Sequence, residues 1–366
     1  MNGFTTTRHT PTFTKLTANT TISQKTPSKS KAAGTGSTKS LLDLIADCNN
    51  KTKSELEAYP HLYLPDEAGN LKFYGVLQKH VFTGIPWSKY GFETRGKSTV
   101  QPANGQATPE AITSNLKKMC RDTDVQKFEG IKKWAAKDEK SDAEYVGLIA
   151  GHPDVRIPDP LGVHFGVAQV GVHLTLYKTN PLRVLVQVRA KTASYGGKLD
   201  QTGAGGRKHG ESVFDGAIRE GKEEIGPGIQ DLVRIKRPVY DGQIVFATTR
   251  PDDAGKFVGT FEISTKASWS FEVPKEWERN AVPEGERDKD VKDFKWMTEE
   301  EIIAAMKANE FKLNSALVMM RFLSRRGQVF KKEQGYEDII KGLEAKIPLP
   351  LPADLKTYGE KKKPTP

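Results

Sequence analysis

The sequence from Gly205 to Pro227 reads GGRKHGESVFDGAIREGKEEIGP, and it is the most informative stretch of the chain for predicting the fold. Glu220, Glu223 and Glu224 are spaced i, i+3 and i+4, which on a helix places three carboxylates on one face with Cβ atoms about 5–6 Å apart. Because like charges repel at this spacing, the pattern predicts a compensating cation. Mg²⁺, with Mn²⁺ as the alternative, suits carboxylate oxygens and can share its ligand shell with a substrate phosphate.

The residues flanking this predicted helix fit a phosphate site. Gly205 and Gly206 precede it and allow the backbone to approach a ligand closely. The N-terminus of a helix favours anions, and Arg219 adjoins the acidic face, where it can neutralise or orient part of it. Taken alone, however, a glutamate-rich helix face is most often a solvated surface.

The whole segment resembles the Nudix box, Gly-x5-Glu-x7-Arg-Glu-U-x-Glu-Glu-x-Gly-U, in which U is a bulky apolar residue. All seven fixed positions are filled, by Gly205, Glu211, Arg219, Glu220, Glu223, Glu224 and Gly226. The two apolar positions differ and carry Gly221 and Pro227. The resemblance implies an α/β fold of the Nudix type, an α/β/α sandwich whose mixed sheet lies between helices and whose box forms a loop, a helix and a loop.

The resemblance also implies roles for the box residues. The implied metal ligands are Glu220, Glu223, Glu224 and the carbonyl group of Gly205. Arg219 joins the three glutamates among the catalytic residues and pairs with Glu211, and the structural frame of the box is Glu211, Gly206 and Gly226. The general base stays open between a box glutamate and a carboxylate further along the chain, Asp290 or Asp293.

Stretches outside the box resemble a narrower group, the Nudix module associated with thiamine pyrophosphokinase, together with its small N-terminal domain. These stretches are 165–175, 199–206 and 310–317 for the module and 41–49 and 74–87 for the N-terminal domain. The resemblance implies a Mg²⁺-dependent hydrolase that converts thiamine diphosphate or its oxidised analogues to the monophosphate and phosphate. The substrate-binding candidates are His173, Arg189, Asp200 and Gln201. On an alternating strand, His173 fits a core position equally well.

Composition divides the chain into four parts. Residues 1–38 are rich in Thr, Ser and Lys and predict a disordered tail or a transit segment. We expect a small α+β domain over 39–150, the Nudix domain over 151–346, and a Pro/Lys-rich tail over 347–366. Three prolines favour a linker over 151–160.

The charge and apolar content restrict the partners. The chain carries a net charge of +10, of which residues 1–42 contribute six basic and no acidic residues, leaving +4 for the rest. A general nucleic-acid surface is therefore not expected, and no apolar run reaches the roughly 18 residues that a membrane helix needs. We expect a small-molecule diphosphate as the partner, while the oligomeric state stays open. Two cysteines suit a reducing compartment, so we expect a cytoplasmic protein, with mitochondrial import as the alternative.

Three other functions remain compatible with the sequence. The box recognises a diphosphate, so the substrate could be a nucleotide sugar, a dinucleotide, a nucleoside triphosphate or a prenyl diphosphate. A Nudix fold that binds a ligand without turnover is the second, although the intact glutamates argue against it. RNA binding by the basic tail is the third, and it predicts an affinity that falls steeply with salt.

Overall fold

The computed structural model describes residues 38–141, 143–147, 152, 154–226, 228–277 and 288–344. Nearly all of the expected N-terminal tail, the whole C-terminal tail and Pro227 lie outside these residues. Within the described part, no helix combines the length and apolar character needed to cross a membrane.

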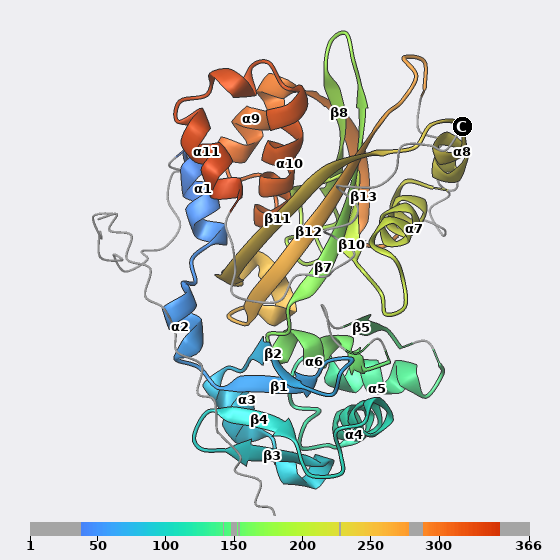
Figure 1. Ribbon diagram of the computed structural model, residues 1–366. Helices are drawn as coiled ribbons and strands as arrows, with labels where there is room; N and C mark the ends of the chain where they lie inside the picture. Colours follow the sequence, from blue (N-terminus) through green and yellow to red (C-terminus); the bar gives the residue numbers. More distant parts are fainter. Residues whose placement is uncertain are drawn as a thin grey trace, which may run out of the picture. The chain divides into compact units, whose positions relative to one another are not determined.

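A mixed seven-stranded sheet forms the centre of the C-terminal half (Figure 1). Its strands are β7 Gln169–Lys178, β8 Arg183–Arg189, β9 Leu199–Asp200, β10 Gly203–Gly206, β11 Val239–Thr249, β12 Phe261–Glu272 and β13 Val291–Thr298. The main order is β11-β12-β7-β8-β13, with β10 paired to β7 and β9 paired to β8. β12 runs parallel to β7 and the other pairs are antiparallel. β7 and β8 pair only at Tyr177 and Lys178, and β9 and β10 take their places as partners further along.

Helices cover both faces of this sheet, as Figure 1 shows. They are α7 Val213–Ile225 and α8 Gly228–Ile235 on one face, and α1 Leu41–Cys48, α9 Glu299–Lys307, α10 Leu313–Arg326 and α11 Tyr336–Leu343 on the other. Alternation along the strands divides the two cores: Leu185 packs on the α7 side, while Val184 and Val186 pack on the α10 side. The expected α/β/α sandwich is confirmed.

Two helices on the α10 side begin at local capping residues. Thr298 with Glu301 forms the capping box that their spacing predicts at the start of α9, and Ser40 caps α1. The sequence also predicts Asn314 as the cap of a helix that ends at Gly327, but Asn314 does not cap α10. It lies inside the helix, buried, and donates a hydrogen bond to Glu262 at 3.2 Å. The hydrogen bond to Glu262 thus engages the Asn314 side chain, which would otherwise be available to cap a helix.

The residues upstream of β7 form a second core around a four-stranded sheet of order β2-β1-β4-β3. Its strands are β1 His61–Pro65, β2 Leu71–Val76, β3 Phe92–Arg95 and β4 Thr99–Pro102. The accompanying helices are α3 Lys79–Gly84, α4 Pro109–Arg121 and α5 Ile131–Asp138, with a 3₁₀ turn η1 Trp87–Tyr90. The short helix α2 Lys53–Glu57 instead buries Leu56 in the core on the α7 side of the larger sheet. Two further 3₁₀ turns, η2 Asp252–Phe257 and η3 Phe330–Lys332, belong to the C-terminal half.

The segment expected to be a linker is largely structured. Arg156–Pro158 forms β6, which pairs with β5 Tyr145–Gly147, and Asp159–His164 forms α6. Val155 through Val167 contributes side chains to the upstream core. Pro158 ends its strand and Pro160 occupies the first turn of α6, two places where a missing backbone N–H costs nothing. Proline there marks element ends rather than a linker.

Candidate active site

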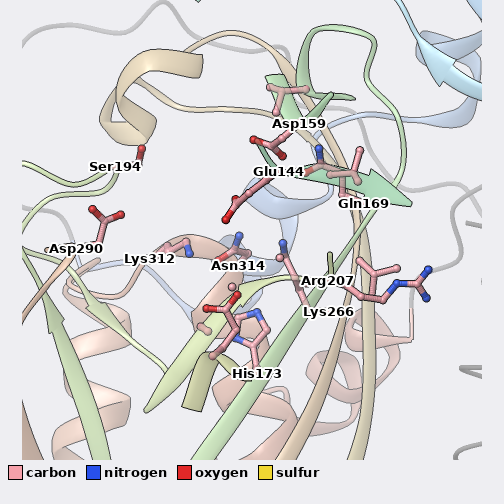
Figure 2. Close-up of a pocket in the computed structure, with 18 of the residues that line it drawn as sticks. Glu144, Asp159, Gln169, His173, Ser194, Arg207, Lys266, Asp290, Lys312 and Asn314 are labelled. Atoms are coloured by element: carbon pink, nitrogen blue, oxygen red, sulfur yellow. The ribbon is translucent and has the colours of Figure 1, made fainter. Parts of the chain in front are cut away.

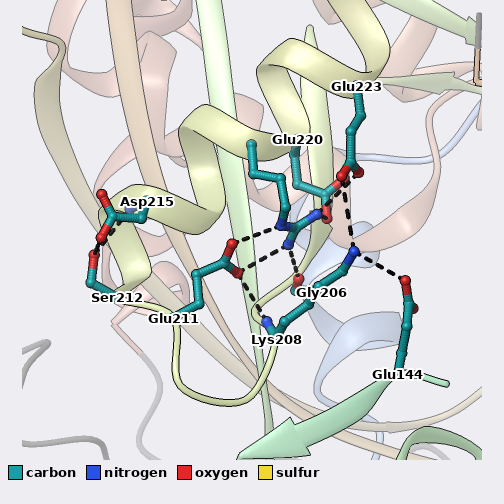
Figure 3. Close-up of polar contacts among 9 residues, drawn as sticks. Glu144, Gly206, Lys208, Glu211, Ser212, Asp215, Glu220 and Glu223 are labelled. Carbon is teal, nitrogen blue, oxygen red and sulfur yellow. Dashed lines mark hydrogen bonds and ion pairs between the residues drawn. The ribbon is translucent and has the colours of Figure 1, made fainter. Parts of the chain in front are cut away.

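The acidic helix is α7, and the side chain of Arg219 on this helix contacts Glu211, Glu220 and Glu223 of the box (Figure 3). Arg219 makes a two-pronged ion pair with Glu211, at 2.7 and 3.0 Å, and donates to the carbonyl of Gly206 at 2.8 Å. The same guanidinium reaches Glu220 at 2.7 Å and Glu223 at 3.1 Å. Although burial acts against the charged form, Glu211 and Glu220 raise the pKa of Arg219 above its ordinary value. The box thus supplies part of its own positive charge.

Two box glutamates are buried beside the β10 backbone. Glu224 accepts a hydrogen bond from the Ala204 N–H at 2.8 Å, and burial raises its pKa well above the ordinary value. Burial also raises the pKa of Glu220, more than Arg219 lowers it. Gly205 lies directly against the Glu220 carboxylate, where a Cβ would collide with it. Glycine at that position allows this close approach of the backbone to the carboxylate; any larger residue would displace the Glu220 carboxylate.

The departure at Gly221 has a packing explanation. A Cβ at Gly221 would lie 3.0 Å from Leu174 of β7 and 3.3 Å from Ile229 of α8. Leu174 and Ile229 therefore occupy the space into which a larger side chain at position 221 would point.

A cavity of about 440 Å³ opens next to the box (Figure 2). Box residues that line it are Gly205, Gly206, Arg219, Glu220, Glu223 and Glu224, which we call the box wall. A second set of lining residues carries positive charge, namely Arg189, Arg250, Lys266 and Lys312, which we call the cationic wall. Glu211 and Gly226 do not line the cavity and support the box from outside it.

The first half of the cationic wall is built on Asp200, which is fully buried. Its carboxylate pairs with Arg189 at 3.1 Å and with Lys312 at 3.1 Å, and it accepts a hydrogen bond from Ser315. Burial would raise the pKa of Asp200, but Lys312 and Arg189 outweigh it and hold the pKa well below its ordinary value. Asp200 therefore positions two cations rather than facing the cavity.

Gln201 has a similar supporting place. It accepts a hydrogen bond from Thr175 at 2.6 Å and donates one to the Ser315 carbonyl at 3.0 Å. Both Asp200 and Gln201 are absent from the cavity lining, whereas the other two substrate-binding candidates, His173 and Arg189, are part of it.

The second half of the cationic wall was not anticipated from the sequence. Glu262, buried, pairs with Arg250 at 3.2 Å and with Lys266 at 3.3 Å. Burial opposes ionisation, but these two cations lower the pKa of Glu262 to about 2. Lys266 on β12 lies opposite Gly171 on β7, and a Cβ at Gly171 would collide with the lysine stem. The available signal was the pair Glu262 and Lys266, two charged residues four positions apart on one face of a strand that is otherwise mostly apolar or hydroxyl-bearing.

His173 is 2% exposed and lines the cavity next to these groups. Burial lowers its pKa to about 3, so the imidazole is neutral at pH 7. Its Nδ1 atom is buried and has no hydrogen-bond partner among the described residues. His173 is thus buried in the core and also lines the cavity. Its position is compatible with both alternatives from the sequence, a core residue and a substrate-binding residue.

The two candidate bases on the later loop differ in position. Asp290 lines the cavity and lies 3.5 Å from Arg189. Asp293, in contrast, is exposed and does not line the cavity. A register shift between Val291 and Asp293 in the pairing of β13 with β8 accompanies this difference.

The donor set of the box wall suits a hard divalent cation. Its carboxylate and carbonyl oxygens are the ligand types that Mg²⁺ and Mn²⁺ prefer. The raised pKa values of Glu220 and Glu224 have the direction that a nearby cation would reverse. Among the described residues, no group of three or more His, Cys, Asp or Glu side chains is arranged to hold a metal ion. Arg219 contacts two of the three glutamates instead, so metal binding requires it to give up those contacts.

Residues 168–317, which hold the mixed sheet and the arginine–glutamate helix, match the family model of the NUDIX domain, so this part of the chain is similar to Nudix domains. Nudix hydrolase 20, chloroplastic, of Arabidopsis thaliana is 27% identical over 184 residues, which cover 49% of this chain and 45% of that protein. An uncharacterized protein of Saccharomyces cerevisiae is 24% identical over 233 residues, which cover 60% of this chain and 64% of that protein.

The chain thus matches 45–64% of the length of these curated relatives. Among solved structures, the Escherichia coli dihydroneopterin triphosphate pyrophosphohydrolase is similar with a TM-score of 0.31 and 15% identity, covering 43% of this chain and 95% of that one.

Proposed function

We propose that this chain is a metal-dependent hydrolase of a diphosphate linkage, acting on thiamine diphosphate or its oxidised analogues. One observation carries the reaction class: the box glutamates and the four cations of the cationic wall line the same cavity. Oxygen ligands for a metal on one side and fixed cations on the other suit a diphosphate, whose hydrolysis depends on positioning and charge neutralisation.

Glu220, Glu223 and Glu224, with the carbonyl of Gly205, would hold Mg²⁺ or Mn²⁺. When bound, the metal supplies charge neutralisation at a phosphoryl oxygen and lowers the pKa of a coordinated water. Arg189, Lys266 and Lys312 hold the opposite side of the diphosphate and stabilise the charge that develops on the leaving phosphate oxygen. A carboxylate accepts a proton from the attacking water, and one P–O bond forms while the bridging P–O bond breaks.

The base is a box glutamate or Asp290. Asp290 lies on the cavity with Arg189 beside it, whereas Asp293 is exposed away from the cavity. Of the two later-loop candidates, this favours Asp290. The products of the proposed reaction are the monophosphate of the organic group and phosphate.

The thiamine-type substrate rests on the resemblance outside the box, and the structure supports it by bringing two of the resembling stretches together. Leu199 and the segment after Glu310 exchange backbone hydrogen bonds, at 2.8 Å from Leu199 N to the Glu310 carbonyl and 2.9 Å from Lys312 N to the Leu199 carbonyl. Both stretches contribute to the cationic wall, one by supplying Lys312 and the other by supplying Asp200, which pairs with it. The alternative is another organic diphosphate, since the box and the cations recognise the phosphates alone.

A product assay on the full chain tests the proposal. The panel contains thiamine diphosphate, its oxidised analogues, ADP-ribose, NADH, nucleoside triphosphates and a prenyl diphosphate, each with Mg²⁺ or Mn²⁺. We expect turnover of a thiamine-type diphosphate that collapses in Glu223→Gln and Glu224→Gln. Turnover of a different panel member with the same collapse would overturn the thiamine assignment. No turnover by folded, metal-binding protein would favour a binding role.

The location of the protein is a separate proposal. The names of two relatives, Nudix hydrolase 20 and Nudix hydrolase 24 of Arabidopsis thaliana, both contain the word chloroplastic. Together with the acid-free N-terminal segment, this favours import into an organelle over the cytoplasm. Imaging a fluorescent fusion of the full chain, with and without residues 1–38, distinguishes the two.

A further inference from the structure

One wall of the cavity comes from residues that precede the Nudix domain. The described lining residues that precede the family match, which begins at residue 168, are Glu144, Tyr145, Val146, Asp159 and Val163. We call these five the upstream wall. The wall is attached to the box loop by backbone contacts: the N–H of His209 donates to the Tyr145 carbonyl at 3.0 Å, and neighbouring residues form a β-bridge.

The two carboxylates of the upstream wall are in different electrostatic situations. Glu144 is paired with Lys208 of the box loop at 3.0 Å. Asp159 lies beside it, since its N–H donates to the Glu144 carbonyl at 3.3 Å, but the Asp159 carboxylate has no hydrogen bond or ion pair among the described residues. Burial, and then the charge of Glu144, raise the pKa of Asp159 to about 6, so it is ionised at pH 7.

Other polar atoms around the cavity also lack a protein partner. Within the part of the chain that the structure describes, the buried amide nitrogen of Gln169 has no hydrogen bond, and neither has Nδ1 of His173, a side chain that is 2% exposed. Both residues line the cavity. Buried polar groups are ordinarily hydrogen-bonded, so unpaired ones facing a cavity point to a ligand that satisfies them.

The upstream carboxylates lie apart from Lys266, although the charge of Arg250 still acts on Asp159 and lowers its pKa, against the larger effects of burial and Glu144. In Figure 2, Asp159, Glu144 and Gln169 lie on one side of the pocket, and Lys266 and His173 lie on the opposite side. A diphosphate between the box wall and the cationic wall leaves the organic part of the substrate facing the upstream wall. An ionised, unpaired carboxylate there favours positive charge on that organic part.

The apolar lining indicates the shape of this group. Three aromatic residues, Tyr145, Tyr195 and Phe257, line the cavity. The Tyr145 hydroxyl is engaged by Asp138 at 2.7 Å, and its ring packs edge-on against Trp134, which fixes its orientation. Fixed aromatic surface beside a carboxylate suits a flat ring that carries a positive charge.

We propose that Asp159, from outside the Nudix domain, is a specificity-determining residue that binds a positively charged heteroaromatic group of the substrate. The inference rests on the proposed function for the placement of the phosphates. It extends that function by assigning the selectivity for the organic group to the upstream segment, while the box and the cationic wall select the diphosphate.

Calorimetric binding to the full chain tests this without turnover. The probes are thiamine, which carries the charged ring and no phosphate, its neutral tricyclic derivative thiochrome, and inorganic pyrophosphate with Mg²⁺. We expect Asp159→Asn to weaken thiamine binding by about ten- to hundredfold, with little change for thiochrome or pyrophosphate. Glu144→Gln should have a smaller effect because Lys208 already neutralises that residue, and the exposed Asp124→Asn should have none.

Pyrophosphate binding also reports whether Asp159→Asn is folded. Equal thiamine affinity in the wild type and Asp159→Asn would overturn the proposal, as would a wild type that binds pyrophosphate and not thiamine. Equal losses for all three probes would assign Asp159 a structural role in α6 instead. Failure of the proposed hydrolysis has a different signature, since it appears as absent turnover whether or not thiamine binds.

Discussion

The box wall and the cationic wall of the cavity are made in opposite ways. The box wall comes from one continuous stretch, in which β10 and α7 supply every residue. The cationic wall is assembled from four separated segments that contribute Arg189, Arg250, Lys266 and Lys312. A wall made by local spacing can be read from the sequence, whereas a wall made by converging strands exists only after folding.

The two walls also differ in their electrostatics. In the cationic wall, Asp200 and Glu262 are buried among cations and their pKa values are lowered. In the box wall, Glu220 and Glu224 are buried with too little positive charge nearby, and their pKa values are raised. The cationic wall is therefore a stabilising element of the fold, while the box wall holds unfavourable charge that a bound cation would relieve.

The largest expected effect is the loss of stability in Asp200→Asn. Removing this charge leaves Arg189 and Lys312 without their buried partner, which should cost about 3–5 kcal/mol in the free energy of unfolding. Because the pKa of Asp200 is lowered, its stabilising contribution is complete above the ordinary pKa of 3.8 and declines as the pH falls below it. Urea denaturation of the wild type and Asp200→Asn at pH 7 and pH 3 measures the loss in the free energy of unfolding and its dependence on pH.

The matched control for Asp200→Asn is Asp293→Asn, which removes an exposed carboxylate. It should change the free energy of unfolding by less than about 0.5 kcal/mol. Equal stability of the two variants would mean that the cationic wall does not depend on Asp200.

Glu223→Gln should remove one proposed metal ligand from the box wall with little effect on the stability of the fold, because Glu223 is the most exposed of the three glutamates. We expect kcat to fall about 10²–10³-fold, the effect of losing one preorganised charge-stabilising group. The assay is product release at saturating Mg²⁺, and Asp231→Asn on α8 serves as the surface control. A kcat within twofold of the wild type would remove Glu223 from the proposed metal site.

Gly205→Ala and Gly206→Ala form a neighbouring pair that sharpens the comparison. A Cβ at Gly205 would strike the Glu220 carboxylate, whereas a Cβ at Gly206 would meet nothing within 4 Å. We expect Gly205→Ala to weaken metal binding about 10–100-fold, as displaced ligands do, and Gly206→Ala to leave it unchanged. Titration with Mn²⁺ followed by electron paramagnetic resonance measures this. Similar affinities in both variants would contradict the close approach.

The smallest expected effect is a gain in stability for Glu224→Gln in metal-free buffer. Because the pKa of Glu224 is raised, the wild type loses stability as the pH rises through that pKa, and the neutral amide does not. Tm should rise by about 2–4 °C at pH 8, and the difference should disappear under acidic conditions. A lower Tm for Glu224→Gln at pH 8 would mean that the ionised carboxylate is stabilised by the fold.

Several features followed from local chemistry and could be predicted. The capping residues Ser40 and Thr298 set the starts of their helices, and the alternation of Val184 and Val186 located β8. The errors came where tertiary contacts compete with local signals. Asn314 pairs with Glu262 rather than capping α10. β4 lies within residues 96–110, where Gly, Pro, Asn and Ser predict a loop.

The box could be identified from the sequence alone, because Gly205, Glu211, Arg219 and the three glutamates lie within one continuous stretch at fixed spacing. Which side chains lie across the cavity from the box depends on the tertiary structure. Gly171 makes room for Lys266 through the parallel pairing of β12 with β7, and Asp159 reaches the cavity because the upstream strand β5 bridges the box loop. These residues are separated by tens of positions in the chain, and no local periodicity relates them, so only the sheet register and the packing of the two halves bring them together.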